Sequence, residues 1–176
     1  MQHLKQLFNA MLALIVMAFT SLSSASPTEI PKKNSGIIHF MNDKNEEKCT
    51  LAVPESSQYF DFGSNNQYCE NNMVSSFWLE NVPSATLINF HAEESCTDAQ
   101  SKQNFYIKFK TVKQSTDWGT QANAISIDSL RNLGKGWLIP KKHIRIESFF
   151  LGSDFNTKSL NEQLSCVYIE RSQPVN

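Results

Sequence analysis

The sequence lacks the local motifs on which most enzyme active sites are built. It contains no H-E-x-x-H, no G-x-S-x-G and no phosphate-binding glycine loop. The histidines His39, His91 and His143 are far apart in the chain, and the acidic pairs Glu46–Glu47 and Glu93–Glu94 fall in polar stretches. We therefore assign no catalytic residue and expect a protein that is not an enzyme.

Beyond the first 25 residues the chain also lacks an apolar run long enough to cross a bilayer. The one long apolar run, 11–22, follows Lys5 and leads into small residues, which is typical of a cleaved secretory signal peptide. We expect residues 1–25 to be removed and residues 26–35 to form a loose mature N-terminus. The protein is then secreted or periplasmic and is not a transmembrane protein.

The charge balance gives no excess of basic residues. Removing residues 1–25 takes away Lys5 and no acidic residue, which leaves 15 basic and 17 acidic side chains. A chain with this balance has no electrostatic attraction for nucleic acid or for an anionic membrane surface. We expect neither as a partner.

All four cysteines lie in the exported part of the chain, and their spacing matches no zinc site. An even number in an oxidising compartment predicts two disulfides, for which three connectivities exist. Of these we favour Cys49 with Cys69 and Cys96 with Cys166.

The remainder of the chain predicts antiparallel β-strands. Several segments alternate apolar and polar residues or are rich in aromatic and β-branched residues, with Asn, Asp, Ser, Gly or Pro between them. One short helical turn is expected near 157–163. The predicted strand segments are 36–40, 58–62, 75–79, 85–90, 104–112, 124–130, 143–151 and 164–170. The aromatic residues expected in the core are Phe60, Phe62, Trp78, Phe90, Tyr106 and Phe109.

The order of segments recurs along the chain. Residues 37–40 and the acidic stretch after them are echoed by 87–90 and a second acidic stretch. Residues 75–88 also align without gaps on 126–139. Two copies of a four-strand unit predict an all-β Greek-key sandwich, in which two inner faces form the core.

The hexapeptide Asn71-Asn72-Met73-Val74-Ser75-Ser76 lies directly before one predicted strand. With the repeat, it resembles the βγ-crystallin-like family, whose microbial members carry two Asn or Asp, two variable residues, Ser or Thr, and Ser as a cation signature. The resemblance covers 36–139 and implies a two-repeat domain there. Residues 140–176 would be a C-terminal β extension packed on the same domain.

By this resemblance, Ca²⁺ would be bound by the side chains of Asn71, Asn72 and Ser75 and by the carbonyl of Met73. Calcium prefers several oxygen ligands, and affinity depends partly on their charge, so neutral Asn residues predict weak binding. The resemblance also implies ligands from both repeats, but the corresponding stretch 121–126 has Ile125 at the hydroxyl position. The alternative is a turn in which these side chains bond only to the local backbone.

Three functions remain open on the sequence. The first is an exported βγ-crystallin-like binding or structural protein with weak calcium binding. The second is an inhibitor of a secreted protease or lysozyme, since a rigid disulfide-tied loop loses little entropy on binding. The third is a toxin or adhesin subunit that binds host glycans, in which Trp118 and Trp137 stack on sugars. The partner is then a protein or a glycan that the sequence does not identify.

Overall fold

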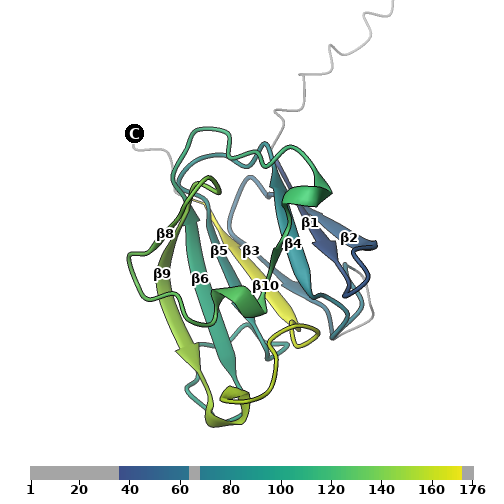
Figure 1. The fold of residues 1–176 in the computed structure, drawn as a ribbon, viewed down its shortest axis with the longest axis vertical. Helices are drawn as coiled ribbons and strands as arrows, with labels where there is room; N and C mark the ends of the chain where they lie inside the picture. Colours follow the sequence, from purple (N-terminus) through teal and green to yellow (C-terminus); the bar gives the residue numbers. More distant parts are fainter. Residues whose placement is uncertain (1–35, 64–67, 172–176) are drawn as a thin grey trace, which may run out of the picture. The chain divides into compact units, whose positions relative to one another are not determined.

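The computed structural model describes residues 36–63 and 68–171, and these form two antiparallel sheets without an α-helix (Figure 1). Residues 1–25, predicted to be a signal peptide, and residues 26–35, predicted to be a loose N-terminus, lie outside the described residues. The strands are β1 (Ile37–Met41), β2 (Glu47–Ala52), β3 (Gln58–Asp61), β4 (Ser76–Glu80), β5 (Leu87–His91), β6 (Phe105–Thr111), β7 (Ile125–Ser126), β8 (Leu138–Ile139), β9 (Ile144–Leu151) and β10 (Cys166–Glu170). Three 3₁₀ turns accompany them: η1 (Gln121–Asn123), η2 (Asp128–Leu130) and η3 (Ser153–Phe155).

The smaller sheet has the order β2-β1-β4-β7, and the larger has the order β3-β10-β5-β6-β9-β8. Strands that follow one another in the chain are therefore not always neighbours. β3 joins the larger sheet although β1, β2 and β4 lie in the smaller one, and β7 joins the smaller sheet although β5 and β6 lie in the larger. Each sheet thus contains a strand from the other half of the chain.

Phenylalanine rings join the two sheets into a sandwich. Phe77 of β4 contacts Phe90 of β5 and Phe109 of β6, with ring centroids 4.9 and 5.3 Å apart, and Phe40 of β1 also contacts Phe90. All four rings are fully buried. Because successive residues of a strand point to opposite faces, these rings share the inner faces with aliphatic residues at alternate positions. Of the six aromatic residues predicted in the core, five are buried, and Trp78 packs partly buried against it.

The registers of two strand pairs match. β1 pairs with β4 from Ile37 opposite Glu80 to Met41 opposite Ser76. β5 pairs with β10 in the same way, from Leu87 opposite Glu170 to His91 opposite Cys166. Pairings of β4 with β7 and of β10 with β3 also correspond position by position.

The segment after residue 139 contributes β9 and β10. β10, yellow in Figure 1, lies between β3 and β5, so it is an interior strand of the larger sheet. β8 and β9 form a hairpin at one edge of that sheet, beside β6.

Two details of the predicted secondary structure are wrong. No helical turn forms at 157–163; the nearest one is η3, because Gly152 starts the turn and its backbone N–H bonds to Asn104. The gapless match of 75–88 with 126–139 does not correspond to similar structure, since the first contains β4 and the second contains η2.

Both disulfides have the pairing that the sequence analysis favoured. Cys49 of β2 is bonded to Cys69, and Cys96 is bonded to Cys166 of β10. Two disulfides fit an oxidising extracellular or periplasmic compartment. None of the helical turns in the described part of the chain has the length and hydrophobicity of a membrane span.

The two disulfides close loops of different length, with sequence separations of 20 and 70. Chain entropy predicts that replacing Cys96 and Cys166 together by Ser lowers the free energy of unfolding by about 4 kcal/mol, against about 3 kcal/mol for Cys49 and Cys69. Urea unfolding of both double variants measures this difference. A smaller loss for the longer loop would contradict the prediction.

Burial lowers the pKa of His91 below its ordinary value of 6.5, although Nδ1–H donates to the Thr97 carbonyl at 3.0 Å, which opposes the shift. The folded state therefore favours the neutral ring. Its contribution to stability is complete above pH 6.5 and is lost as the pH falls toward the folded-state pKa, by at most about 1.4 kcal/mol per pH unit. We expect His91→Gln to flatten the fall in unfolding free energy between pH 7 and pH 5.

The matched control for this measurement is His143→Asn, because His143 has a positive φ of 54° that Asn tolerates. Denaturant unfolding at several pH values gives the slopes. Equal slopes for wild type and His91→Gln would show that His91 does not cause the pH dependence.

Candidate functional site

Residues 71–76 form the turn that leads into β4. Asn72 has a positive φ of 58°, a backbone conformation that Asn tolerates better than most residues. Its backbone N–H donates to the carbonyl of Leu164, 3.3 Å away. The turn is therefore joined to the segment before β10, which is distant in the chain.

Residues 161–166 form the equivalent backbone hydrogen bond to residues 71–76. Glu162 has a φ of 60°, and its N–H donates to the carbonyl of Val74 at 2.7 Å. In each segment, the second residue has a positive φ and bonds to the fourth residue of the other segment. We call the two segments, 71–76 and 161–166, the clamp segments.

The surroundings of the clamp segments also correspond. Ser75 donates its N–H to Met41 at the end of β1, and Ser165 donates its N–H to His91 at the end of β5. The Ser75 carbonyl then accepts from Ile127, and the Ser165 carbonyl accepts from Phe62. The two segments are thus exchanged by an approximate two-fold relation.

The prediction that 121–126 corresponds to 71–76 in the second repeat is wrong. Residues 121–126 form η1 and β7 and do not exchange the backbone hydrogen bonds described above. The signal for the true partner is present in the sequence: 161–166 reads N-E-Q-L-S-C beside N-N-M-V-S-S for 71–76. The hairpin of β8 and β9 separates β7 from 161–166, so the two clamp segments are 90 residues apart and not about 50.

The first clamp segment carries three buried side-chain oxygens without a hydrogen-bond partner in the described part of the chain. These are Asn71 Oδ1, Ser75 Oγ and Ser76 Oγ. Buried polar atoms in native proteins are nearly always paired, so each such atom requires an explanation. A bound cation is one explanation for unpaired oxygens of this kind.

The second clamp segment contributes a hydroxyl next to Asn72. Ser165 Oγ lies 3.4 Å from Asn72 Oδ1, which is long for an O–H···O hydrogen bond. A carboxylate also approaches, because Glu94 Oε1 accepts from Asn71 Nδ2 at 3.2 Å. Of the acidic stretches after β1 and β5, it is therefore the one after β5 that reaches the predicted site.

The four predicted ligand residues divide between two sides of the clamp, one around Asn72 and Ser165 and the other around Ser75 and Glu162. Asn72 contacts 164–165, whereas Ser75 contacts Met41 and Ile127 and follows Val74, the acceptor for Glu162. Asn71 contacts Glu94, and Met73 lies between the two sides. Within 36–63 and 68–171, no three His, Cys, Asp or Glu side chains gather at one point, so the candidate ligands are mainly amide and hydroxyl oxygens.

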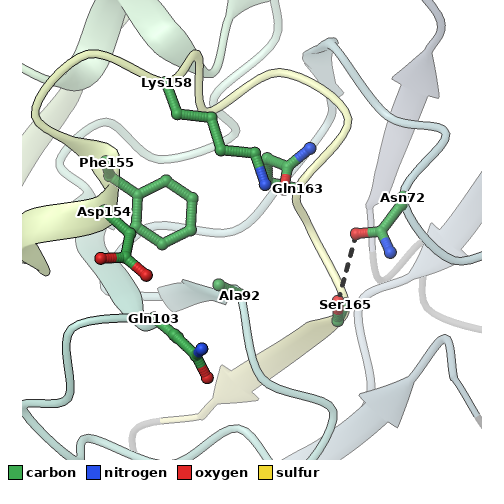
Figure 2. A pocket seen from close by; sticks show the side chains of 8 residues that line it. All are labelled: Asn72, Ala92, Gln103, Asp154, Phe155, Lys158, Gln163 and Ser165. Carbon is green, nitrogen blue, oxygen red and sulfur yellow. Dashed lines mark hydrogen bonds between the residues drawn. The ribbon is translucent and has the colours of Figure 1, made fainter.

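A cavity of about 320 Å³ opens beside Asn72 and Ser165 (Figure 2). Its other walls come from the end of β5, from the turn before β6 and from residues 154–163. The lining residues are Asn72, Ala92, Gln103, Asp154, Phe155, Lys158, Gln163 and Ser165.

An ion pair holds the loop that carries several of these residues. The Asp128 carboxylate accepts from Arg131 Nη2 at 2.7 Å and from the Leu160 N–H at 2.8 Å. Burial alone would raise the pKa of Asp128, but these donors hold it below its ordinary value. Arg131 also donates to the carbonyls of Phe155 and Lys158, so the loop is bonded at both of its ends.

The histidines and tryptophans have separate environments. His39 stacks on Trp78 with centroids 3.7 Å apart, and its ring nitrogens lie 2.6 Å from Glu47 and 2.9 Å from Glu80. Trp118 is buried in the core and donates its ring N–H to Lys142, so it offers no face for a sugar. Trp137 is 59% exposed.

No family model matches this sequence, and no curated protein or solved structure matches the chain. The arguments about function therefore depend on the geometry of the clamp segments and of the cavity.

We expect Arg131→Ala to lower the free energy of unfolding by about 1.5–3 kcal/mol, because it leaves Asp128 and several loop carbonyls without their charged donor. Amide hydrogen exchange in residues 154–160 should become faster. The control is Arg145→Ala, whose exposed pair with Glu147 should contribute less than about 1 kcal/mol. Equal losses for the two variants would contradict the role given to Arg131.

Proposed function

We propose that the chain is an exported, non-enzymatic protein of βγ-crystallin type that binds Ca²⁺ weakly between its two clamp segments. The observation that carries this proposal is the reciprocal contact of 71–76 with 161–166, which brings together two segments that carry amide and hydroxyl oxygens, some of them unpaired. The clamp gives the protein a cation-stabilised scaffold for binding a partner.

The strand order supports a duplicated Greek-key layout. In each half, the fourth strand lies beside the first, the second lies on the other side of the first, and the third strand joins the facing sheet. The first half consists of β1–β4. The second consists of β5, β6, β7 and β10, with the β8–β9 hairpin inserted between its third and fourth strands.

The donor atoms fit a hard cation. Ca²⁺ takes six to eight oxygens, and two oxygens at about 2.4 Å from one ion and at right angles to each other lie about 3.4 Å apart. Asn72 Oδ1 and Ser165 Oγ have this separation. On the other side, Ser75 Oγ is buried without a partner, and Glu162 is the residue of the clamp segments that supplies a carboxylate.

The backbone at Glu162 also supports a site there. A positive φ costs most residues other than Gly, Asn and Asp some free energy, and such strain is concentrated at functional positions. Glu162 adopts a φ of 60°, where Asn72 occupies the corresponding position of the first segment. Replacing Asn by Glu at a strained position is understandable if the carboxylate is needed for binding.

Calcium should raise the melting temperature of the mature, disulfide-bonded protein. With a dissociation constant of about 0.1–1 mM, about 10 mM Ca²⁺ adds about 1.4–2.7 kcal/mol to the free energy of unfolding. For a domain of this size that is an increase of about 4–8 °C. Ser75→Ala and Glu162→Gln should each remove most of the calcium-induced shift that arises from the Ser75 side of the clamp. Ser165→Ala should remove most of the shift that arises from the Asn72 side.

Differential scanning calorimetry in Ca²⁺ and in chelator measures the shift, with Mg²⁺ at the same ionic strength as the control for screening. Glu55→Gln is the control variant, because Glu55 is an exposed acidic residue outside the clamp segments. Identical melting curves in calcium and chelator would refute the cation proposal while leaving the fold unaffected.

A further inference from the structure

The cavity beside the clamp contains two opposite charges that are not paired with each other. Asp154 and Lys158 belong to one loop, and both line the cavity. Neither the carboxylate nor the ammonium group has a hydrogen-bond or ion-pair partner within residues 36–63 and 68–171. Lys158 Nζ contacts only the Phe155 ring, 5.6 Å from its centroid. In Figure 2 the two side chains extend on opposite sides of that ring.

The loop that carries these charges is held in place by its backbone. The Asp154 N–H donates to Lys102, and the Gly152 N–H donates to Asn104. A Cβ atom at Gly152 would lie 2.4 Å from the carbonyl oxygens of Ser101 and Lys102, so only glycine allows this close approach. Arg131 bonds to the carbonyls of Phe155 and Lys158. The backbone that carries the exposed side chains of Asp154 and Lys158 is therefore fixed, which lowers the backbone part of the entropy cost of binding.

Uncharged polar groups lie between the two charges. Gln103 has a free amide, and Gln163 donates its amide to the Glu162 carbonyl at 2.6 Å, which leaves its oxygen as an acceptor. Asn72 also lines the cavity, with its side-chain oxygen toward Ser165, and Ala92 forms an apolar wall. The cavity can therefore form hydrogen bonds to both donors and acceptors of a small molecule.

We infer that this cavity binds a small zwitterion of the α-amino acid class. Asp154 accepts from the ligand ammonium group, Lys158 donates to its carboxylate, and the amides of Gln103 and Gln163 bond the remaining polar groups. At about 30 Å³ for each water-sized group, about 320 Å³ holds about ten non-hydrogen atoms, which is the size of a small amino acid or a dipeptide.

A sugar fits the cavity less well. Sugar sites usually present an open aromatic face, and Phe155 is only 4% exposed, with Lys158 over its ring. The inference does not rest on the calcium proposal, although Asn72 and Ser165 border both sites.

Isothermal titration of the mature, disulfide-bonded chain with glycine, L-serine, L-glutamine and glycylglycine, one at a time, tests the inference. We expect saturable binding of at least one of them up to about 10 mM. Binding by glycylglycine but not by the free amino acids would place the two charges farther apart and still support a zwitterion. Absence of saturable binding by all four compounds, or binding of D-glucose in their place, would overturn the inference.

Blocked ligands separate the two charges. L-serine methyl ester lacks the carboxylate charge and N-acetyl-L-serine lacks the ammonium group, so each should bind at least about tenfold more weakly than L-serine. Asp154→Asn should weaken L-serine about tenfold and leave N-acetyl-L-serine unchanged, and Lys158→Met should show the converse with the methyl ester. Equal affinity of blocked and free ligands would refute the assignment of these residues.

The surface control is Lys135→Met, which lies outside the cavity and should bind L-serine like wild type. Unchanged melting temperatures of the variants show that they remain folded. All titrations are run in chelator and in about 10 mM Ca²⁺. Binding in chelator supports the zwitterion site whether or not calcium binds, and a calcium-induced melting shift without any zwitterion binding separates failure of this inference from failure of the calcium proposal.

Discussion

The backbone hydrogen bonds exchanged between Asn72 and Leu164 and between Glu162 and Val74 are the constraint on which the rest of the structure depends. They fix the starting points of β4 and β10, and each of these strands then pairs with two neighbours in its sheet. Both disulfides anchor the same segments, because Cys69 lies just before the first and Cys166 ends the second. The covalent links and the backbone bonds therefore act on one place, where the sheets meet.

The two halves of the clamp differ in chemistry although their backbones correspond. The side with Asn72 and Ser165 has neutral ligands and opens to a cavity with a free carboxylate and a free ammonium group. The side with Ser75 is approached by the backbone of Glu162, whose N–H bonds to the carbonyl of Val74. The proposed cation site and the proposed zwitterion site thus belong to one approximately symmetric scaffold.

Much of the fold is predictable from local sequence, because strands with buried inner faces show alternating or aromatic-rich patterns. β6 and β9 are examples. β2 was not predicted, since only Leu51 is buried in its polar sequence EKCTLA, and β8 is too short to leave a pattern. The predicted strand 124–130 contains β7, but that strand ends at Ser126 and the chain continues into η2. The segment 71–76 was identified from its residue types alone. Its partner 161–166 was missed because the inserted hairpin changed the spacing, and the approach of Glu94 depends on tertiary contacts that no local pattern encodes.

The position of β10 affects how the protein reaches its folded state. β3 has β10 as its neighbour in the sheet, so the backbone of β3 pairs only when the segment that begins at Cys166 is in place. Pairings between such distant residues form slowly, because a long loop must be closed before any contact compensates for it. Until β10 inserts between them, the edges of β3 and β5 are open to wrong pairing. Completion of the larger sheet thus depends on the C-terminal quarter of the chain, in which Cys166 forms its disulfide with Cys96.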